Sequence, residues 1–306
     1  MRLCAVSVDL DEIPNYFGIH GLPEPTGPEG TLVYDVAVDR LATLADELSI
    51  PLTLFAIGSD LARPEAASKL AAARARGFEI GNHSLDHRYD LVRLGREEIR
   101  RQVDEGALAI ERATGQRPAG FRAPGYTITD EVFDVLGELG VEYDSSVFPC
   151  PPYYSAKAAA IGLIALRGRA SRSIVDSPVV LAAPTRPYRV GRPYWRRGSG
   201  MVELPVQVTR GLRLPFFGTS VTLGGPAVAS GLARMCVGDP LVNLELHGID
   251  VLDAEDGLEP LRPHQKDVRV PVERKLASLR AAVGTLRKAG YAFVTLREAA
   301  RAFAAS

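Results

Sequence analysis

The chain has 306 residues, 46% hydrophobic and 24% charged, which is typical of a globular protein with one large domain or two small ones. Its net charge of −1 argues against a nucleic-acid-binding protein. The three cysteines, Cys4, Cys150 and Cys236, are far apart, which argues against a disulfide framework and a cysteine-based zinc site. The first apolar run ends at Asp9 and no run is long enough to cross a bilayer, so we expect a cytoplasmic protein without a signal peptide.

Short apolar runs that alternate with helical spacing predict a series of strands and helices. The expected strands are 3–8, 51–57, 78–81, 118–121, 141–143, 202–208, 241–246 and 292–296. The expected helices are 36–48, 64–76, 96–114, 129–139, 272–289 and 297–304, with a loop over 14–30. Repeated βα units imply a parallel sheet or barrel, whose C-terminal strand ends carry the chemistry.

The βα pattern is interrupted between about residues 149 and 225. We expect one domain over 1–306, in which 150–225 is an insertion that faces a substrate or a membrane. Residues 167–213 contain ten arginines but only two acids. Because arginine binds phosphate and aromatic rings stack on sugar faces or lie at a membrane interface, Trp195 and Arg196 predict contact with an anionic ligand at the membrane surface. The alternative is a solvated basic loop.

His83 and His87 are separated by four positions and follow a predicted strand. On one helical turn, two such imidazoles would point the same way and could bind one cation. The alternative is a solvated loop, because histidines also fall four apart by chance.

Asp9 and Asp11 lie at the end of the first predicted strand. In a strand, residues two apart face the same side, so both carboxylates can enter one pocket. One could bind a metal while the other acts as a base. A solvated strand end is the alternative, and Asp11 with Glu12 is another possible pair.

Three further polar residues follow predicted strands. Arg122 begins the sequence Arg-Ala-Pro-Gly and could hold a carboxylate with two donors. His247 ends an apolar strand, where an imidazole suits a general acid near neutral pH. Asp144 ends another strand, and for it and His247 taken singly a structural role is an alternative.

Taken in order, these motifs resemble the polysaccharide deacetylases, the NodB-homology carbohydrate esterases of family 4. The resemblance covers about residues 3–140 well and 241–296 more loosely, and His-Ser-x-x-His and Phe-Arg-Ala-Pro-Gly are its most specific parts. The Asp-x-Asp form is similar to the branch with lipid-linked sugar deformylases and some peptidoglycan deacetylases. The resemblance implies a deformed (β/α) barrel of about seven strands.

The resemblance also implies a role for each residue of these motifs. Asp11, His83 and His87 would bind a divalent metal. Zinc suits this ligand set, although cobalt, nickel and iron are not excluded. Asp9 would be the general base, oriented by Arg122, although the Asp-x-Asp spacing leaves the base and ligand roles of the two aspartates open.

The remaining implied roles concern the acyl group and the leaving amine. Gly125 would stabilise the oxyanion through its N–H, with Tyr126 beside it in the substrate site. His247 would protonate the amine, oriented by Asp144. Two positions depart from the family pattern, since Gly125 stands where many members have an aromatic residue and Ser145 stands where the common branch has tryptophan.

The sequence therefore predicts a metal-dependent hydrolase that removes an acetyl or formyl group from an amino sugar. Its partner would be a small or lipid-linked sugar, with peripheral contact to the inner face of an anionic membrane and none to nucleic acid. Two other functions stay open: hydrolysis of a cyclic amide on the same scaffold, and sugar binding without catalysis.

Overall fold

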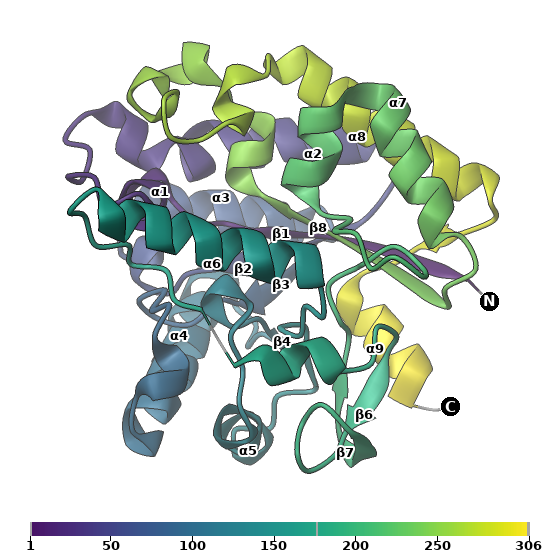
Figure 1. Ribbon diagram of the computed structural model, residues 1–306. Helices are drawn as coiled ribbons and strands as arrows, with labels where there is room; N and C mark the ends of the chain where they lie inside the picture. Colours follow the sequence, from purple (N-terminus) through teal and green to yellow (C-terminus); the bar gives the residue numbers. More distant parts are fainter. Residues whose placement is uncertain (1, 176, 305–306) are drawn as a thin grey trace.

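The structure is a computed structural model that describes residues 2–175 and 177–304. A nine-stranded sheet lies at its centre in the order β6-β7-β5-β4-β3-β2-β1-β8, with β9 also paired to β1 (Figure 1). The strands are β1 Leu3–Asp9, β2 Leu52–Ala56, β3 Glu79–Asn82, β4 Gly120–Phe121, β5 Tyr143–Asp144, β6 Tyr188–Val190, β7 Arg197–Glu203, β8 Leu241–His247 and β9 Ala292–Phe293. Only the β6–β7 pair is antiparallel among the described pairs.

The two edges of this sheet approach each other beyond β7. The backbone N–H of Gln207 donates to the carbonyl oxygen of Asn243 on β8 at 3.2 Å. This contact connects the chain after β7, the strand next to the β6 edge, with β8 at the opposite edge, as expected for a deformed barrel. The parallel pairing of β7 with β5 places part of the predicted insertion, 150–225, in the barrel itself.

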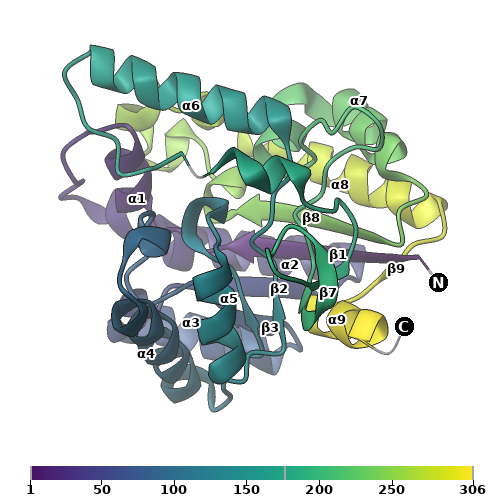
Figure 2. The ribbon, with the colours of Figure 1, turned by 60° about the horizontal axis from the view of Figure 1, so that its bottom comes forward.

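Nine α-helices surround the strands within the described residues (Figures 1 and 2). They are α1 Ile13–Ile19, α2 Val38–Leu48, α3 Pro64–Ala75, α4 Arg96–Thr114, α5 Asp130–Glu138, α6 Pro151–Leu166, α7 Gly218–Cys236, α8 Val272–Lys288 and α9 Leu296–Ala304. The prediction for α4 is confirmed at both ends. The predicted loop over 14–30 is wrong at its start, because Glu12 caps α1 by accepting from the N–H of Ile13.

Alternation along β1 decides which side chains enter the barrel. Cys4, Val6 and Val8 pack in the larger core, which also contains residues of α2, α7 and α8. Leu3 and Ala5 face the interior and pack with Leu296 and other residues of α9. Because side chains two apart share a side of a strand, Ser7 and Asp9 continue this interior row toward the C-terminal end of β1.

No helix in the described ranges is long and apolar enough to cross a membrane.

Gly106 of α4 allows this helix to approach the segment that follows β3. A Cβ at Gly106 would lie 2.8 Å from Oδ1 of Asn82 and 2.8 Å from the backbone carbon of Ser84. Asn82 in turn donates to the carbonyl oxygen of Val103 on α4 at 2.8 Å. Because Gly106 has no side chain, α4 can pack closely against the segment that leads into His83 and hold it in place.

We expect Gly106→Ala to lower the free energy of unfolding. Overpacking typically costs about 1–3 kcal/mol, against about 1 kcal/mol of helix propensity gained on replacing glycine. Gly284→Ala on α8 is the matched control, because a Cβ there meets no atom within 4 Å. Thermal or urea unfolding measures both variants, and equal stabilisation of the two would contradict the packing argument.

Candidate active site and metal centre

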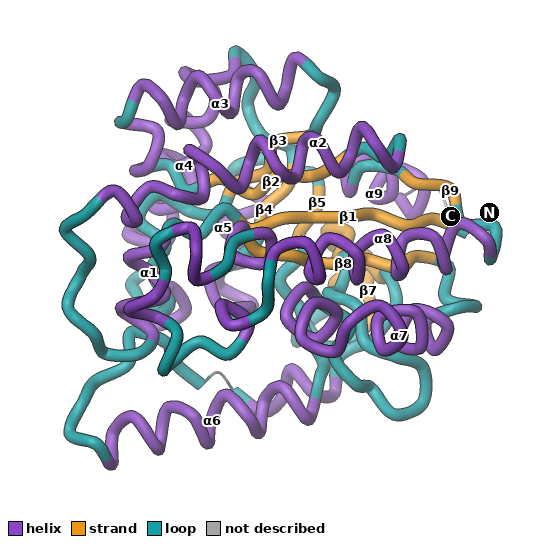
Figure 3. Tube along the Cα trace, turned by 90° about the horizontal axis from the view of Figure 1, so that it is seen from above, coloured by secondary structure: helices purple, strands orange, loops and turns teal. Residues whose placement is uncertain are grey.

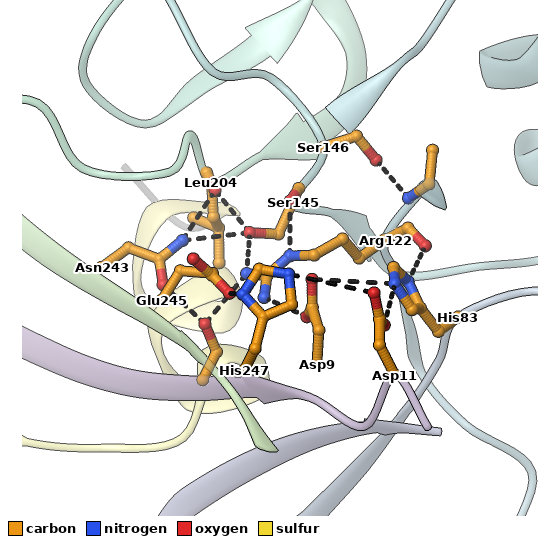
Figure 4. Close-up of polar contacts among 12 residues, drawn as sticks. Asp9, Asp11, His83, Arg122, Ser145, Ser146, Leu204, Asn243, Glu245 and His247 are labelled. Atoms are coloured by element: carbon orange, nitrogen blue, oxygen red, sulfur yellow. Dashed lines mark hydrogen bonds and ion pairs between the residues drawn. The ribbon is translucent and has the colours of Figure 1, made fainter. Parts of the chain in front are cut away.

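The candidate residues gather at the C-terminal ends of the strands. Asp9, the last residue of β1, is in register with His247, the last residue of β8, and with Phe55 of β2. His83 directly follows β3 and Arg122 directly follows β4. Since parallel strands end at the same edge of a sheet, five separated segments of the chain meet here (Figure 4).

Asp11, His83 and His87 form the centre of this group. Nε2 of His83 lies 3.2 Å from Oδ1 of Asp11, and Nε2 of His87 lies 3.1 Å from Oδ2 of Asp11. All three residues are buried, and one potential ligand atom from each lies within 4.8 Å of the others. Two imidazoles and one carboxylate form a donor set that suits a divalent metal such as zinc.

The hydrogen bonds around these residues also fit a metal. Nδ1 of His83 lies 2.7 Å from the carbonyl oxygen of Arg122. With the proton on Nδ1, the lone pair of Nε2 is available to a cation. Oδ1 of Asp11 and both ring nitrogens of His87 are buried without a hydrogen-bond partner among the described residues. Such buried polar atoms are costly unless another group binds them.

The charges of the three residues are strongly coupled. Burial would raise the pKa of Asp11, but the electrostatic attraction of the nearby imidazoles of His87 and His83 outweighs it and holds that pKa well below its usual value. Burial lowers the pKa of His87. Burial also opposes a charge on His83, but the carboxylates of Asp9 and Asp11 outweigh it and raise the pKa of that imidazole. Asp11 is thus favoured as an anion, the form that binds a metal.

The two histidines are brought together by an irregular loop, so the expectation that they share a helical turn is wrong. Ser84 and His87 have positive φ angles of 70° and 51°. Oδ1 of Asn82 accepts from the N–H of Ser84 at 3.0 Å, and Oγ of Ser84 accepts from the N–H of His87 at 3.2 Å. These local hydrogen bonds stabilise the loop, and the loop brings the two imidazoles together as one helical turn would have done.

Glu12 is separate from the metal-binding group. Its carboxylate accepts from the N–H groups of Val33 at 3.0 Å and Tyr34 at 3.1 Å, in addition to capping α1. Burial raises the pKa of Glu12 to about 7, although these backbone hydrogen bonds oppose the shift. The alternative pair of Asp11 with Glu12 is therefore not supported by the geometry.

Arg122 is fully buried and contacts Asp9 directly. Nη1 donates to Oδ1 of Asp9 at 2.7 Å, and Nη2 donates to the hydroxyl oxygens of Ser7 and Ser145 at 2.9 Å each. The guanidinium also lies over the ring of Phe55, 4.2 Å from its centroid. The expected pairing of Arg122 with Asp9 is present in the structure.

His247 is paired with Glu245, a residue that the sequence analysis did not select. Nδ1 of His247 lies 3.0 Å from Oε1 of Glu245, which comes from the same strand, β8. Burial would lower the pKa of His247, but the charge and hydrogen bond of Glu245, with smaller contributions from Asp11 and Asp9, raise it well above its usual value. The geometry favours a protonated imidazole at this position.

The expectation that Asp144 orients His247 is wrong. Its carboxylate accepts from the backbone N–H of Ser146 at 2.9 Å and from the hydroxyl of Ser146 at 2.8 Å. Oγ of Ser146 in turn accepts from the N–H of Ala123 at 2.8 Å. Burial raises the pKa of Asp144 and that of Glu203 beside it. Asp144 therefore supports the backbone next to Arg122.

Tyr126 lies close to His247, and Gly125 lies beside Tyr89. Gly125 has a φ of 63°, and a Cβ there would lie 2.9 Å from the ring of Tyr89. The ring of Tyr126 lies 6.3 Å from that of His247. Tyr16 also lies beside His247, at 6.4 Å, and Tyr89 lies beside His87, at 4.8 Å.

The sequence analysis missed Tyr16 and Tyr89. Together with Tyr126, they have buried hydroxyl groups without a hydrogen-bond partner among the described residues. Tyr89 follows the histidine motif by two positions, which is the one signal that could have indicated it. Tyr16 lies in the segment that we expected to be a loop.

Trp195 and Arg196 do not lie at this site. They lie in the connection between β6 and β7, and Trp195 packs against the cluster that contains Phe133 and Tyr194. In the pairing with β5, Glu203 at the end of β7 matches Asp144. The start of β7 therefore points toward the opposite end of the barrel, beside α9, where Arg189 donates to the carbonyl oxygen of Ala304 (Figure 1). The predicted substrate contact through these two residues is wrong.

Asp9, Glu245 and His247 form a second group with metal-ligand geometry. Asp9 already binds the guanidinium of Arg122. A divalent cation among these three residues would therefore lie near a buried positive charge. This repulsion favours the group of Asp11, His83 and His87 as the metal site.

Residues 29–143 match the family model described as polysaccharide deacetylase. The peptidoglycan deacetylase-like protein FGM2 of Gibberella zeae is 30% identical over 149 residues, which are 46% of this chain and 43% of that protein. The chain thus spans less than half the length of this relative.

Two solved structures are similar over most of the chain. A candidate polysaccharide deacetylase from Mycobacterium smegmatis has a TM-score of 0.52 and 20% identity, covering 96% of this chain and 93% of its own. The CE4 family pseudoenzyme BA3943 from Bacillus anthracis also has a TM-score of 0.52, with 13% identity, covering 97% and 64%. The predicted deformed (β/α) barrel is confirmed by this similarity of fold.

We expect His87→Ala and Asp11→Ala to weaken binding of added Zn²⁺ or Co²⁺ by about 100-fold or more, because even the loss of a ligand's hydrogen-bond partner costs about 10–100-fold. Titration calorimetry and the visible spectrum of bound Co²⁺ measure this. His264→Ala is the control, since His264 lies 5.7 Å from the ring of His20 in a separate histidine pair. Full metal binding by both site variants would contradict the assignment.

Proposed function

The chain belongs to the polysaccharide deacetylase family, and from this premise we propose that it is a metal-dependent hydrolase that removes an N-acyl group from an amino sugar. The observation that carries the proposal is the grouping of Asp11, His83 and His87 between two differently partnered residues, Asp9 and His247. Amide hydrolysis requires an activated nucleophile and a proton for the leaving nitrogen. This arrangement offers a group for each.

Asp11, His83 and His87 would hold the metal. When bound there, a divalent metal supplies Lewis-acid chemistry, which lowers the pKa of water and polarises the acyl carbonyl. The carbonyl of Arg122 orients His83 for this purpose through Nδ1. Asp11 lies between the two histidines, which favours Asp11 over Asp9 as the carboxylate ligand.

Asp9 would act as the general base. Oδ1 of Asp9 is bound by Arg122, while Oδ2 lies 3.7 Å from Nε2 of His83. One oxygen is thus fixed by a buried cation and the other faces the metal ligands. Arg122 stabilises the negative charge of Asp9 and fixes the orientation from which it can accept a proton.

His247 would act as the general acid. Glu245 binds Nδ1, so Nε2 faces Asp11 at 3.9 Å. The side chain of His247 is 20% exposed, whereas those of Asp9, Asp11, His83 and His87 are at most 5% exposed. A proton held by His247 therefore lies on the open side of the site, where the leaving amine would arrive.

Tyr16, Tyr89 and Tyr126 would bind the substrate. A buried hydroxyl without a partner gains a hydrogen bond when a polar ligand enters. Sugar hydroxyls and phosphates can both accept from a tyrosine. Within the proposed class we include both acetyl and formyl groups and a lipid-linked amino sugar, as the Asp-x-Asp motif implies. The cytoplasmic location stays a prediction.

The proposal is tested by amine release from a panel of N-acetyl and N-formyl amino sugars, free and lipid-linked, with cyclic amides as a separate arm. We expect activity on an amino sugar that requires Zn²⁺ or Co²⁺ and is lost in Asp9→Asn. Activity confined to cyclic amides would support the alternative hydrolase. Sugar binding without turnover by the metal-loaded protein would contradict the proposal and indicate a non-catalytic binding protein.

We expect Glu245→Gln to shift the alkaline limb of the kcat/KM profile to lower pH. Activity that needs protonated His247 is lost as the pH rises through its pKa. Glu245 raises that pKa, so removal of its charge lowers the pH at which activity is lost.

The matched control is Glu79→Gln. Glu79 is a partly buried glutamate, and its carboxylate accepts from Tyr143 and Thr53, residues outside the proposed site. The pH profile of this control should match that of the wild type. If the alkaline limb of the kcat/KM profile of Glu245→Gln also stayed at the wild-type pH while kcat fell, the role of Glu245 would be structural and not an effect on the pKa of His247.

A further inference from the structure

Helix α6, Pro151–Leu166, is apolar and yet none of its residues is buried. Lys157 is its one charged residue. Leu163 is 49% exposed and Leu166 is 86% exposed. A surface helix normally has a polar outer face. Here the outer face is formed by small and aliphatic residues, and Figure 3 shows α6 at the margin of the molecule, set apart from the strands.

The segment around α6 is basic as well as apolar. Residues 145–175 contain four basic residues, Lys157, Arg167, Arg169 and Arg172, and no acidic residue. Arg172 pairs with Glu24 at 2.6 Å. Arg167 and Arg169 are exposed and have no carboxylate within 4.0 Å in the described part of the chain. Positive charge therefore remains at the end of the apolar helix.

Helix α6 also lies next to the candidate active site. Tyr153 near its start packs 5.8 Å from the ring of Tyr126, which borders His247. Nζ of Lys157 donates to the carbonyl oxygen of Gly125 at 3.0 Å. Beyond its end, the N–H of Arg172 donates to the carbonyl oxygen of Gly18 in α1 at 3.0 Å. The helix thus connects two sides of the site (Figure 2).

We propose that α6 and the arginines after it bind an anionic lipid surface, with α6 lying in the plane of the membrane. A helix of this length is about 24 Å long. Its aliphatic side chains would enter the bilayer, and the arginines after its end would reach the headgroups. This surface replaces the Trp195 region as the membrane contact. That the bilayer then presents a lipid-linked substrate to the site rests on the proposed function.

Charge favours a membrane over a second copy of the chain as the partner. A symmetric contact through α6 would bring together two segments that each lack an acid between residues 145 and 175. Neither copy would then supply a carboxylate from this segment to Arg167 or Arg169. Anionic headgroups supply the missing charge, and the aliphatic side chains find an apolar phase in the bilayer.

The test is co-sedimentation with vesicles of phosphatidylcholine alone or with added phosphatidylglycerol. We expect wild-type protein to bind the anionic vesicles, and to bind less at high salt. Leu166→Glu should weaken binding by about tenfold or more, because it places a negative charge where the bilayer is expected. The control is Leu108→Glu on α4, where the leucine is 38% exposed and which lies far from α6 in Figure 3.

A comparison of two double variants separates binding through the arginines after α6 from general electrostatic attraction of the protein to anionic vesicles. Arg167→Gln with Arg169→Gln should weaken binding to anionic vesicles more than Arg96→Gln with Arg100→Gln, which makes the same change in net charge on α4. Thermal unfolding checks that all variants fold. Equal effects of the two pairs, or of Leu166→Glu and Leu108→Glu, would overturn the proposal.

Two further measurements keep this inference distinct from the proposed function. Light scattering of wild type and Leu166→Glu reports self-association, and a dimer that Leu166→Glu dissociates, without vesicle binding, would assign α6 to a contact between copies. Hydrolysis of a water-soluble N-acyl amino sugar without vesicles reports the chemistry alone, which Leu166→Glu should retain. Vesicle binding without hydrolysis would contradict the proposed function and leave the docking inference standing.

Discussion

The buried guanidinium of Arg122 connects the strand ends on which the candidate site depends. It donates to Asp9 and Ser7 of β1 and to Ser145 after β5, and it lies over Phe55 of β2. A cation removed from water is unfavourable unless its donors are satisfied, and the loss of one partner of a buried pair typically costs about 3–5 kcal/mol. The positions of β1, β2 and β5 are therefore coupled to the charge of Asp9.

This coupling explains how two neighbouring aspartates can have different roles. Asp9 is held by Arg122, whereas Asp11 lies beyond the strand and contacts two imidazoles. The difference in partners separates the carboxylate that faces a fixed cation from the carboxylate that can bind a metal. His247 completes the arrangement because Glu245 fixes its orientation from the same strand.

The sequence could predict those parts of the site that depend on local order along the chain. Each of the residues Asp9, Asp11, His83, Arg122 and His247 follows or ends an apolar run, and parallel strands bring such ends together. Glu245 could also have been found, because it lies between Leu244 and Leu246 and shares a side of the strand with His247. Asp144 was misassigned because the order of motifs does not say which carboxylate reaches which histidine.

By itself, the sequence determined the alternation of strands and helices, the family resemblance and the identity of the residues at the strand ends, because these follow from short-range periodicity and motif order. Tertiary structure decided the partner of His247, the irregular loop of His83 and His87, and the separation of Trp195 from the site. It also decided that α6 is exposed. Burial and pairing depend on contacts between distant segments, and an apolar run reads the same in sequence whether it packs inside the barrel or lies on its surface.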